Sequence, residues 1–429
     1  MKTQGKSIPR PWRKVRIEEI FAPLEDGRTM HQGWSPQCEK QPSRSEKDWG
    51  VLRTTSIQPG EFQPEHNKLL PSKLEPRPLL EVKPGDILIT CAGPRIRCGI
   101  SCLVENTRGR LMISGKMYRF RTRPDEVSAK YVVAFLQSED AAIAIDGMKT
   151  GGSESGLNLT HERFRQLLVP MAPLSEQRRI VGILDEAFEG LATAKANAEQ
   201  NLQNARALFE SHLQAVFTHR GDGWDRMTLE TLLERGWIED HMDGNHGGDY
   251  PRKEEFISEG VPYISANCLD GERVDMSRAK YLSPSRAALL RKGFAKDNDV
   301  LFAHNATVGP VTILHTDEEK VILGTSLTYY RCNRAHILPE YLAHYMRSFG
   351  FKTQYLQVMR QSTRNQVPIT KQREFFHVVP PLDEQKAIIG QLDGLLDNGQ
   401  RLESLYQRKL AALDELKKSL LHRAFSGQL

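Results

Sequence analysis

The side chains best suited to chemistry in this sequence are cations and amides gathered in four polar loops. The loops cover residues 92–99, 148–153, 303–309 and 359–365. Arginine makes paired hydrogen bonds to guanine, and asparagine or glutamine makes paired hydrogen bonds to adenine, so such loops can read base edges. An ordinary polar surface loop is the simpler alternative for each. The candidate readers are Arg95, Arg97, Lys149, His304, Asn305, Thr307, Arg360, Gln361, Arg364 and Asn365.

A second candidate surface is the segment 117–123, which alternates like a β-strand. Tyr118 and Phe120 would lie on one face, and three arginines would share the other. Guanidinium groups pair well with phosphate, so the arginine face is a candidate for backbone contacts with nucleic acid. The alternative is a solvated strand face. The arginines are Arg119, Arg121 and Arg123, and the remaining cationic candidates are Arg53, Lys116 and Arg331.

The sequence contains no recognisable motif for catalysis. The segment from Gly109 to Lys116 resembles a phosphate-binding loop, but it is one residue too long and Met117 replaces the required Ser or Thr. The sequence has no GxSxG, HExxH or kinase signature and no amino-methyltransferase pattern. The six cysteines form no CxxC pair and match no zinc-finger spacing. We therefore expect reduced thiols, no metal site, no bound cofactor and no catalytic residues.

The composition favours a multidomain protein that does not enter a membrane. A chain of 429 residues suggests two to four domains, and the net charge of +5 is compatible with nucleic acid. The N-terminus is polar and leads to no apolar run, and no segment approaches the roughly 18 apolar residues of a membrane span. We expect a cytoplasmic protein, with a loose basic tail at residues 1–11.

The elements that would position the polar loops occur twice. Residues 173–177 read Pro-Leu-Ser-Glu-Gln, and residues 381–385 read Pro-Leu-Asp-Glu-Gln. The two segments then match without a gap as far as Phe217 and Phe425. A repeat of this length indicates one structural unit that is used twice.

Each repeated segment predicts one long helix. Apolar or small residues alternate in steps of four and three, which is typical of a coiled-coil seam. About 45 residues would span roughly 65 Å. Two equivalent helices that cover each other's seam form a closed pair, so we expect them to run antiparallel. The predicted seam includes Ile180, Leu184, Leu191 and Leu208 in the first helix and Ile388, Leu392, Leu402, Leu413 and Leu416 in the second.

The globular segments before each helix also echo each other, but weakly. Both start at a tryptophan, Trp12 or Trp224, and Gly85-Asp86 and Asn298-Asp299 both precede a predicted buried strand. By symmetry, Trp12 should lie near the end of the second helix, which makes the fold nearly circular. Helices that match well and domains that match poorly indicate one shared job and two different targets. The predicted boundaries are 1–172, 173–220, 221–380 and 381–429.

This plan resembles the specificity subunit of type I restriction–modification enzymes. The resemblance rests on Pro-Leu-(Ser/Asp)-Glu-Gln at the start of each helix and on the tryptophan at the start of each domain, and it covers nearly the whole chain. It implies an α+β fold with two mixed α/β target-recognition domains. Two long α-helices would separate the domains and form an intramolecular antiparallel coiled coil with pseudo-two-fold symmetry.

The resemblance also implies a function and partners. Each domain would read one half of a bipartite site on double-stranded DNA, and the coiled coil would set the distance between the halves. Two methyltransferase subunits would supply S-adenosylmethionine and catalysis, and restriction subunits would supply ATP-driven translocation and cleavage. The alternatives are a coiled-coil scaffold without a DNA role and a self-sufficient restriction–methylation enzyme. Paired Arg/Asn/Gln loops in divergent domains argue against the scaffold, and the missing cofactor motifs argue against the enzyme.

Overall fold

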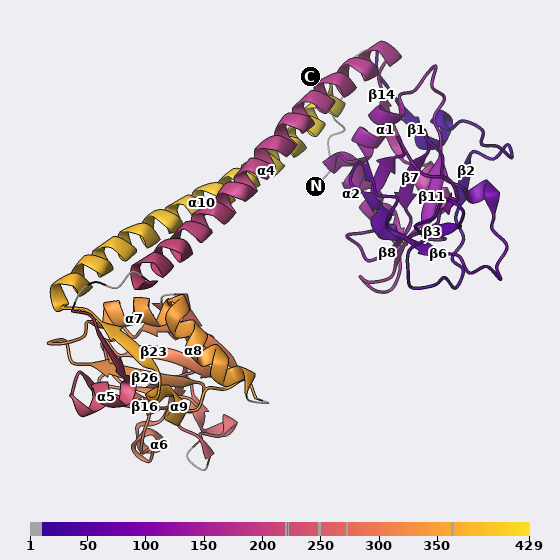
Figure 1. Ribbon diagram of the computed structural model, residues 1–429. Coiled ribbons are helices and arrows are strands. Elements are labelled where there is room, and N and C mark those ends of the chain that lie inside the picture. The colour runs from indigo at the N-terminus through magenta and orange to yellow at the C-terminus, as the bar shows by residue number, and fades with distance from the viewer. Residues whose placement is uncertain (1–10, 219–220, 222, 248–249, 272, 362–363) are drawn as a thin grey trace. The chain divides into compact units, whose positions relative to one another are not determined.

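The computed structural model describes residues 11–218, 221, 223–247, 250–271, 273–361 and 364–429, so most of the expected N-terminal tail lies outside it. The chain forms two compact units. The first consists of Met1–Ala198 and Arg408–Leu429, and the second consists of Glu199–Gln407. Each unit therefore holds one globular domain, one end of the first long helix and the opposite end of the second (Figure 1).

The first domain is built around a four-stranded antiparallel sheet with the order β2-β11-β7-β9. Three helices cover one face, and the other face packs on a small sheet with the order β10-β3-β6. Because both faces of the main sheet are covered, every residue of its central strands is buried. The elements are β2 (Met30–Gln32), β3 (Gly50–Leu52), β6 (Asn67–Leu69), β7 (Ile87–Thr90), β9 (Ser101–Leu103), β10 (Leu111–Met112), β11 (Met117–Phe120), α1 (Ala129–Leu136), α2 (Glu139–Met148) and α3 (His161–Arg165).

The second domain repeats this topology strand for strand. Its main sheet has the order β16-β26-β23-β24, again antiparallel, and β21-β18-β25 forms part of a second sheet with the same pairing directions as β6-β3-β10. The weak sequence echo therefore reflects a real duplication of the fold. The elements are β16 (Ile238–Asp243), β18 (Val261–Ile264), β21 (Lys280–Leu282), β23 (Val300–Asn305), β24 (Thr307–Ile313), β25 (Val321–Leu323), β26 (Leu327–Cys332), α7 (Pro339–Arg347), α8 (Phe349–Arg360) and α9 (Ile369–Arg373).

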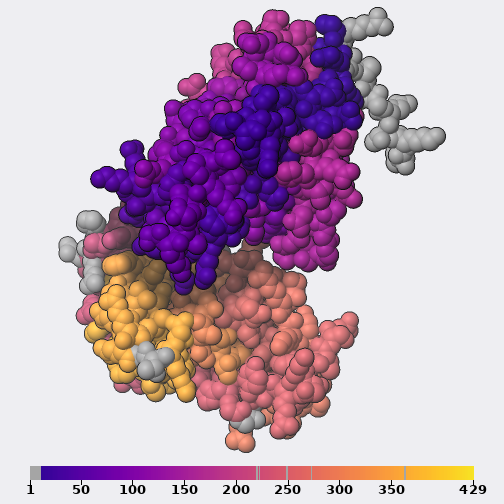
Figure 2. Space-filling model, turned by 90° about the vertical axis from the view of Figure 1, so that its right-hand side faces the viewer, coloured from indigo at the N-terminus to yellow at the C-terminus, as the bar shows by residue number. Residues whose placement is uncertain are grey.

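Each domain comes from one continuous stretch of chain, indigo to violet for the first and pink to orange for the second (Figure 2). Its first and last strands pair antiparallel, β1 (Arg13–Arg16) with β14 (Leu168–Met171) and β15 (Asp225–Thr228) with β27 (Phe376–Val379). The shorter elements are β4 (Ile57–Gln58), β5 (Glu61–Phe62), β8 (Ala92–Gly93), β12 (Lys149–Thr150), β13 (Leu157–Leu159), α5 (Leu229–Glu234), β17 (Phe256–Ile257), β19 (Leu269–Asp270), β20 (Arg273–Val274), α6 (Pro284–Ala288) and β22 (Phe294–Ala295).

The turns before the central strands show how the duplication survives sequence change. Gly85 and Asn298 both have positive φ, at 89° and 67°. These are residue types that tolerate the left-handed region. The next residue caps the turn in both domains, because Asp86 accepts from the amide of Lys83 at 2.7 Å and Asp299 accepts from that of Lys296 at 2.8 Å. The same turn is therefore made with different side chains.

The two repeated segments form the long helices α4 (Leu174–Thr218) and α10 (Leu382–Ser426), each of 45 residues. Within each unit the residue numbers of contacting partners rise along α4 as they fall along α10, so the two helices run antiparallel, as predicted (Figure 1). The contacts are Arg179 with the Leu429 carbonyl and Lys195 with Asp414 in the first unit, and Arg206 with Glu403 and His212 with Gln391 in the second. Among the described residues, no helix has the length and apolar character needed to cross a bilayer.

The contact stripe between the helices differs from the predicted seam in its later turns. Ile180, Leu184, Ile388 and Leu392 are buried as predicted, and Leu191 and Leu413 are half-buried. The predictions for Leu208, Leu402 and Leu416 are wrong, because these side chains are 57%, 38% and 47% exposed. An α-helix has 3.6 residues per turn, so its contact face drifts by about 20° per heptad from a strict 3.5-residue pattern. Phe209, Glu403 and Lys417, one position later, take the predicted places.

The glutamine of each repeated motif anchors its helix to its own domain. The side-chain oxygen of Gln177 accepts from the amide of Ser128 at 2.9 Å, and its nitrogen donates to the carbonyls of Glu126 and Ala172. Gln385 makes the equivalent set, with the Leu338 amide at 2.9 Å and the His336 and Pro380 carbonyls. Both glutamines are 0% exposed. They satisfy backbone groups at the start of α1 and α7 and so fix the angle between helix and domain.

The far end of each long helix packs on the domain of the unit in which that end lies. Phe425 at the end of α10 contacts Tyr131 and Phe135 of α1 edge-on, and Phe217 at the end of α4 contacts Tyr341 and Tyr345 of α7 in the same way. Trp12 and Leu429 pack against the core of the first unit, as expected from the symmetry of the repeat. Each domain is thus held by the start of one helix and the end of the other.

The observed stripe predicts a difference between two leucines of α10. Leu392→Ala removes a side chain that is 0% exposed and should lower the free energy of unfolding by about 2–5 kcal/mol. Leu402→Ala should lower it by about 1 kcal/mol or less, because that side chain already contacts water. Urea denaturation of the full chain measures both, and equal losses would contradict the observed stripe.

The anchors predict that Gln385→Leu destabilises the second unit. The substitution leaves the Leu338 amide and two carbonyls without partners, which should cost about 1–3 kcal/mol for each group that stays buried. Urea denaturation measures the loss, and hydrogen exchange should show faster exchange of the Leu338 amide. Gln400→Leu, at an exposed position of the same helix, is the matched control and should change neither quantity.

Candidate nucleic-acid interface

The polar loops predicted from the sequence come together in pairs, one pair in each domain. In the first domain, β13 pairs with both β8 and β12, and the Arg95 amide donates to the Glu154 carbonyl at 3.0 Å. In the second domain, the Ala306 amide donates to the Asn365 carbonyl at 2.9 Å. Each domain therefore presents one composite surface made from two segments that lie about 50 to 60 residues apart in the chain.

In the first domain, the predicted readers hold the loop itself. Arg95 forms ion pairs with Asp146 at 2.6 Å and Glu154 at 2.7 Å, which raises the pKa of its guanidinium. Arg97 donates to the Ile57 carbonyl at 2.7 Å, to the Thr54 carbonyl and to the side chain of Gln58. In the free protein, both cations therefore make contacts that stabilise the loop.

Lys149 also makes contacts that stabilise the loop. Its ammonium group donates to the Arg95 carbonyl and to Asp146, both at 3.0 Å, and its side chain is only 8% exposed. The loop from 92 to 99 thus has a fixed conformation, and Ile96 at its tip is 82% exposed. Ile96 was not among the residues predicted from the sequence, although it stands between two predicted readers, Arg95 and Arg97, in a glycine-bounded loop. An apolar side chain there can contact a thymine methyl group.

The predicted arginine face of residues 117–123 is only partly covered: Arg119 is buried, Arg121 is half-buried and Arg123 is exposed. Arg119 is 0% exposed and lies between Asp86 at 3.2 Å and Glu25 at 3.0 Å, so the expectation that it contacts phosphate is wrong. Arg121 binds Asp86 at 2.6 Å, and Arg123 binds Glu126 at 3.3 Å. The alternation was predicted correctly, but it cannot distinguish a solvated face from one covered by a second layer.

Two predicted readers of the second domain are also structural. His304 is 2% exposed and its Nδ1 lies 2.9 Å from the Val367 carbonyl, so the expectation that it reads a base is wrong. Arg331 binds Asp299 at 2.7 Å, as Arg121 binds Asp86 in the first domain. Burial raises the pKa of Asp299 even though Arg331 lies against it. Both side chains stabilise the sheet beneath the loops.

The remaining predicted residues lie on the surface. In the second domain, Asn305 is half-buried and five residues are exposed, and all six belong to the two paired loops or to the adjoining end of α8. In the first domain, Arg53 and Lys116 are exposed, and Arg53 also donates to the Lys40 carbonyl at 2.9 Å. The exposed residues of the second domain are Thr307, Arg360, Gln361, Arg364 and Asn365.

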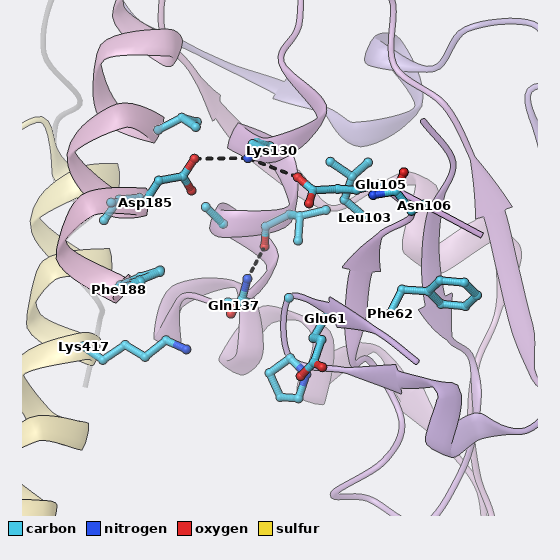
Figure 3. Close-up of a pocket in the computed structure, with 16 residues that line it drawn as sticks. Glu61, Phe62, Leu103, Glu105, Asn106, Lys130, Gln137, Asp185, Phe188 and Lys417 are labelled. Carbon is cyan, nitrogen blue, oxygen red and sulfur yellow. Dashed lines mark hydrogen bonds and ion pairs between the residues drawn. The ribbon is translucent and has the colours of Figure 1, made fainter. Parts of the chain in front are cut away.

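A cavity of about 510 Å³ lies beside the packed contact between the first domain and the helices of its unit (Figure 3). Lys130 bridges Glu105 at 3.1 Å and Asp185 at 3.2 Å on one side, and Lys417 lines the other. This arrangement of ion-paired groups has no nucleophile beside a base. Across the described parts of the chain, no group of three or more His, Cys, Asp or Glu side chains is arranged to hold a metal ion.

The six cysteines are free, as the sequence predicted, and five of them are buried. Burial raises the pKa of Cys91 and of Cys102 to about 12. Thiols of this kind are protonated near neutral pH and react slowly. They serve as small apolar residues of the core.

Comparisons with known proteins point to one group. No family model matches the chain. The specificity subunit of the type I restriction enzyme EcoEI of Escherichia coli is 41% identical over 209 residues, which cover 49% of this chain and 34% of that protein. The EcoBI specificity subunit of Escherichia coli is 21% identical over 63% of this chain and 60% of its own length. This chain thus spans less than two thirds of both relatives.

A third relative and two solved structures cover the chain more fully. The EcoKI specificity subunit of Escherichia coli strain K12 is 22% identical over 422 residues, 96% of this chain and 89% of that protein. A chain from a study of complex assembly and conformational transition of the type I restriction–modification system has a TM-score of 0.77 at 19% identity, covering 99% of this chain and 100% of its own. The HsdS subunit of Thermoanaerobacter tengcongensis has a TM-score of 0.61 at 18% identity, with both chains fully covered. The fold, the duplicated helix motif and these likenesses agree: the curated relatives are specificity subunits of type I restriction enzymes, and the structural neighbours share the fold of this chain.

Proposed function

We propose that this chain is the sequence-specific DNA-binding subunit of a type I restriction–modification assembly and is not itself catalytic. The observation that carries the proposal is the combination of matching main-sheet topology with different loops. Two domains share every strand of the main sheet and the same glutamine anchor, yet their paired loops carry different side chains. A scaffold protein would need no such difference between its two halves.

In this proposal each domain reads one half of a bipartite site on double-stranded DNA. The exposed amides and arginines of the second domain suit adenine and guanine, and Ile96 of the first suits thymine. Cations outside the loops would contact phosphate, so affinity should fall steeply as salt rises. A stiff helix pair suits the spacing of two half-sites, because half-sites must be met at a defined distance and rotation along the duplex.

The proposed partners supply the chemistry that this chain lacks. Two methyltransferase subunits, one for each unit, would bring S-adenosylmethionine to the bound DNA, and restriction subunits would bring translocation and cleavage. The internal duplication supports the number two, because equivalent units present equivalent surfaces. The place of action would be the cytoplasm, where the DNA of a bacterial cell lies.

The loops predict that Arg360→Ala alters recognition of one half-site only. A guanidinium that pairs with guanine contributes about 1–3 kcal/mol of discrimination, so roughly five- to 150-fold selectivity at one base pair should be lost. Sequencing of methylated adenines in DNA modified by the assembled methyltransferase would measure the change. Ile96→Ala, at the exposed tip of the first-domain loop, should affect only the other half-site, and Arg235→Ala, outside both loops, should affect neither. Equal weakening on unrelated sequences would show that Arg360 touches only phosphate.

The helix pair predicts that spacing and recognition can be changed separately. Insertion of seven residues into α4 after Ala198 and seven into α10 after Gln407 lengthens both helices by roughly 10 Å, close to three base pairs. Both half-site sequences should stay the same while the spacer between them grows by about three base pairs. Mapping of methylated sites measures this. A changed half-site, or an unchanged spacer, would contradict the proposed role of the helices.

A further inference from the structure

We propose that one backbone carbonyl in each domain holds the paired loops in register, and that the side chains donating to it are positioning residues for recognition. The carbonyl is that of Leu159 in the first domain and of Val367 in the second. The donors are Tyr118 in the first domain and Gln372 with His304 in the second. This inference rests on the proposed function, because it takes the paired loops as the reading surface.

The two carbonyls occupy the same place in the duplicated fold. The Leu159 amide donates to the Cys91 carbonyl at 2.8 Å, and the Val367 amide donates to the His304 carbonyl at 2.8 Å. Cys91 and His304 lie at equivalent positions of the central strands and lead into the first loop of each pair. Leu159 and Val367 each follow the second loop. The carbonyl therefore marks the point where the two loops of a pair are joined.

In the first domain, the donor to this carbonyl is a tyrosine in apolar surroundings. Tyr118 on β11 donates its hydroxyl to the Leu159 carbonyl at 2.6 Å and is 3% exposed. Its ring packs edge-on against His161 and stacks on Phe164. Burial raises its pKa, so the hydroxyl stays protonated and remains a donor at every physiological pH.

In the second domain, different side chains donate to the equivalent carbonyl. Thr328 takes the place of Tyr118 and is too short to reach the carbonyl. Gln372, which takes the place of Phe164, donates to the Val367 carbonyl at 3.1 Å and is 0% exposed. The side-chain oxygen of Gln372 accepts from three donors, so the amide is held in one orientation. These donors are Thr328 at 2.9 Å, Tyr330 at 3.0 Å and Nε2 of His241 at 3.2 Å.

His304 adds a second donor to the same carbonyl. Its Nδ1 lies 2.9 Å from the Val367 oxygen, so Nδ1 carries the proton. Its Nε2 is buried and has no hydrogen-bond partner among the described residues, which leaves no acceptor for a second proton. Burial lowers the pKa of His304, so the ring is neutral near pH 7 and its donor atom is fixed. The two equivalent carbonyls, of Leu159 and Val367, thus accept hydrogen bonds from unrelated sets of donors.

In the second domain, the loops depend on this point because the other contacts described between them lie near their exposed ends. In the described part of the second domain, these contacts join Ala306 with Asn365 and, through a single bridge, Asn305 with Gln366. A buried carbonyl that loses a donor is less well satisfied, which favours local opening. Loss of the hydrogen bond to this carbonyl should therefore loosen the loops without unfolding the sheet beneath them.

Hydrogen exchange of the full chain tests the proposal with one variant in each domain. Tyr118→Phe removes only the donor hydroxyl and should speed exchange in residues 92–99 and 149–159 by roughly two- to twelvefold, the value of one net hydrogen bond. Gln372→Glu keeps the shape and the acceptor for the three donors, but it replaces the N–H that faces the Val367 carbonyl by a carboxylate oxygen, so the carbonyl keeps only the His304 donor and faces a second acceptor. At pH 8 it should speed exchange in residues 303–309 and 364–367.

The pH profile separates positioning from a general structural effect. When the carboxylate introduced by Gln372→Glu is protonated, it regains a donor. Exchange in the second domain should then return toward the wild-type rate as the pH is lowered through the pKa of this carboxyl group, after correction for intrinsic exchange. Each variant should leave the loops of the other domain unchanged, so the two serve as controls for each other. Unchanged loops, faster exchange throughout a domain, or no recovery once the carboxyl group is protonated would overturn the positioning role.

Methylation mapping with the same variants in the assembled methyltransferase tests the link to recognition. Tyr118→Phe should relax one half-site and Gln372→Glu the other. Loosened loops with an unchanged methylated sequence would overturn the assignment of these loops to recognition, while the exchange data would still support the positioning role.

Discussion

A buried glutamine at the start of each long helix is the interaction on which the arrangement of this protein depends. Gln177 and Gln385 each join three backbone groups from two chain segments inside a site closed to water. An amide side chain suits this task because it donates and accepts at once. The helices themselves have polar outer faces and narrow apolar stripes. The other directional contacts between a domain and its helix, such as Lys130 with Asp185 and His344 with Asp393, involve carboxylates that are more than half exposed, whereas the glutamines are closed to water.

The anchor explains why the helices kept their sequence while the domains changed. Its geometry needs the proline-led turn before the helix and the glutamine within it, so those residues recur in both copies. The domains need only present an amide and two carbonyls, which any sequence supplies. Their interiors were therefore free to diverge. Tyr118 and Phe164 in one domain correspond to Thr328 and Gln372 in the other, yet the backbone path is the same.

Divergence beneath the loops has a consequence for recognition. A loop that reads bases discriminates between them only if its conformation is fixed. A cluster of hydrogen bonds, as around Gln372, and apolar packing, as around Tyr118, can both fix it. Several cations that looked free in the sequence are used for this purpose. Arg95, Arg97 and Lys149 brace the first loop, and Arg119 joins two layers of the domain. Fewer side chains are therefore left for the proposed contact with DNA, and most of them lie at loop tips.

The sequence by itself determined the two helices, their antiparallel pairing and the duplication of the domains, because periodicity and repeats are local properties of a chain. It also located the polar loops, since equivalent positions in both copies carried similar loops. It misplaced Leu208, Leu402 and Leu416, because a contact face drifts along a real helix. Only the tertiary structure decided that the loops meet in pairs and that Arg119 and His304 are interior, since both depend on layers contributed by distant segments. The same holds for Gln372, whose role exists only where β16, β26 and a loop converge.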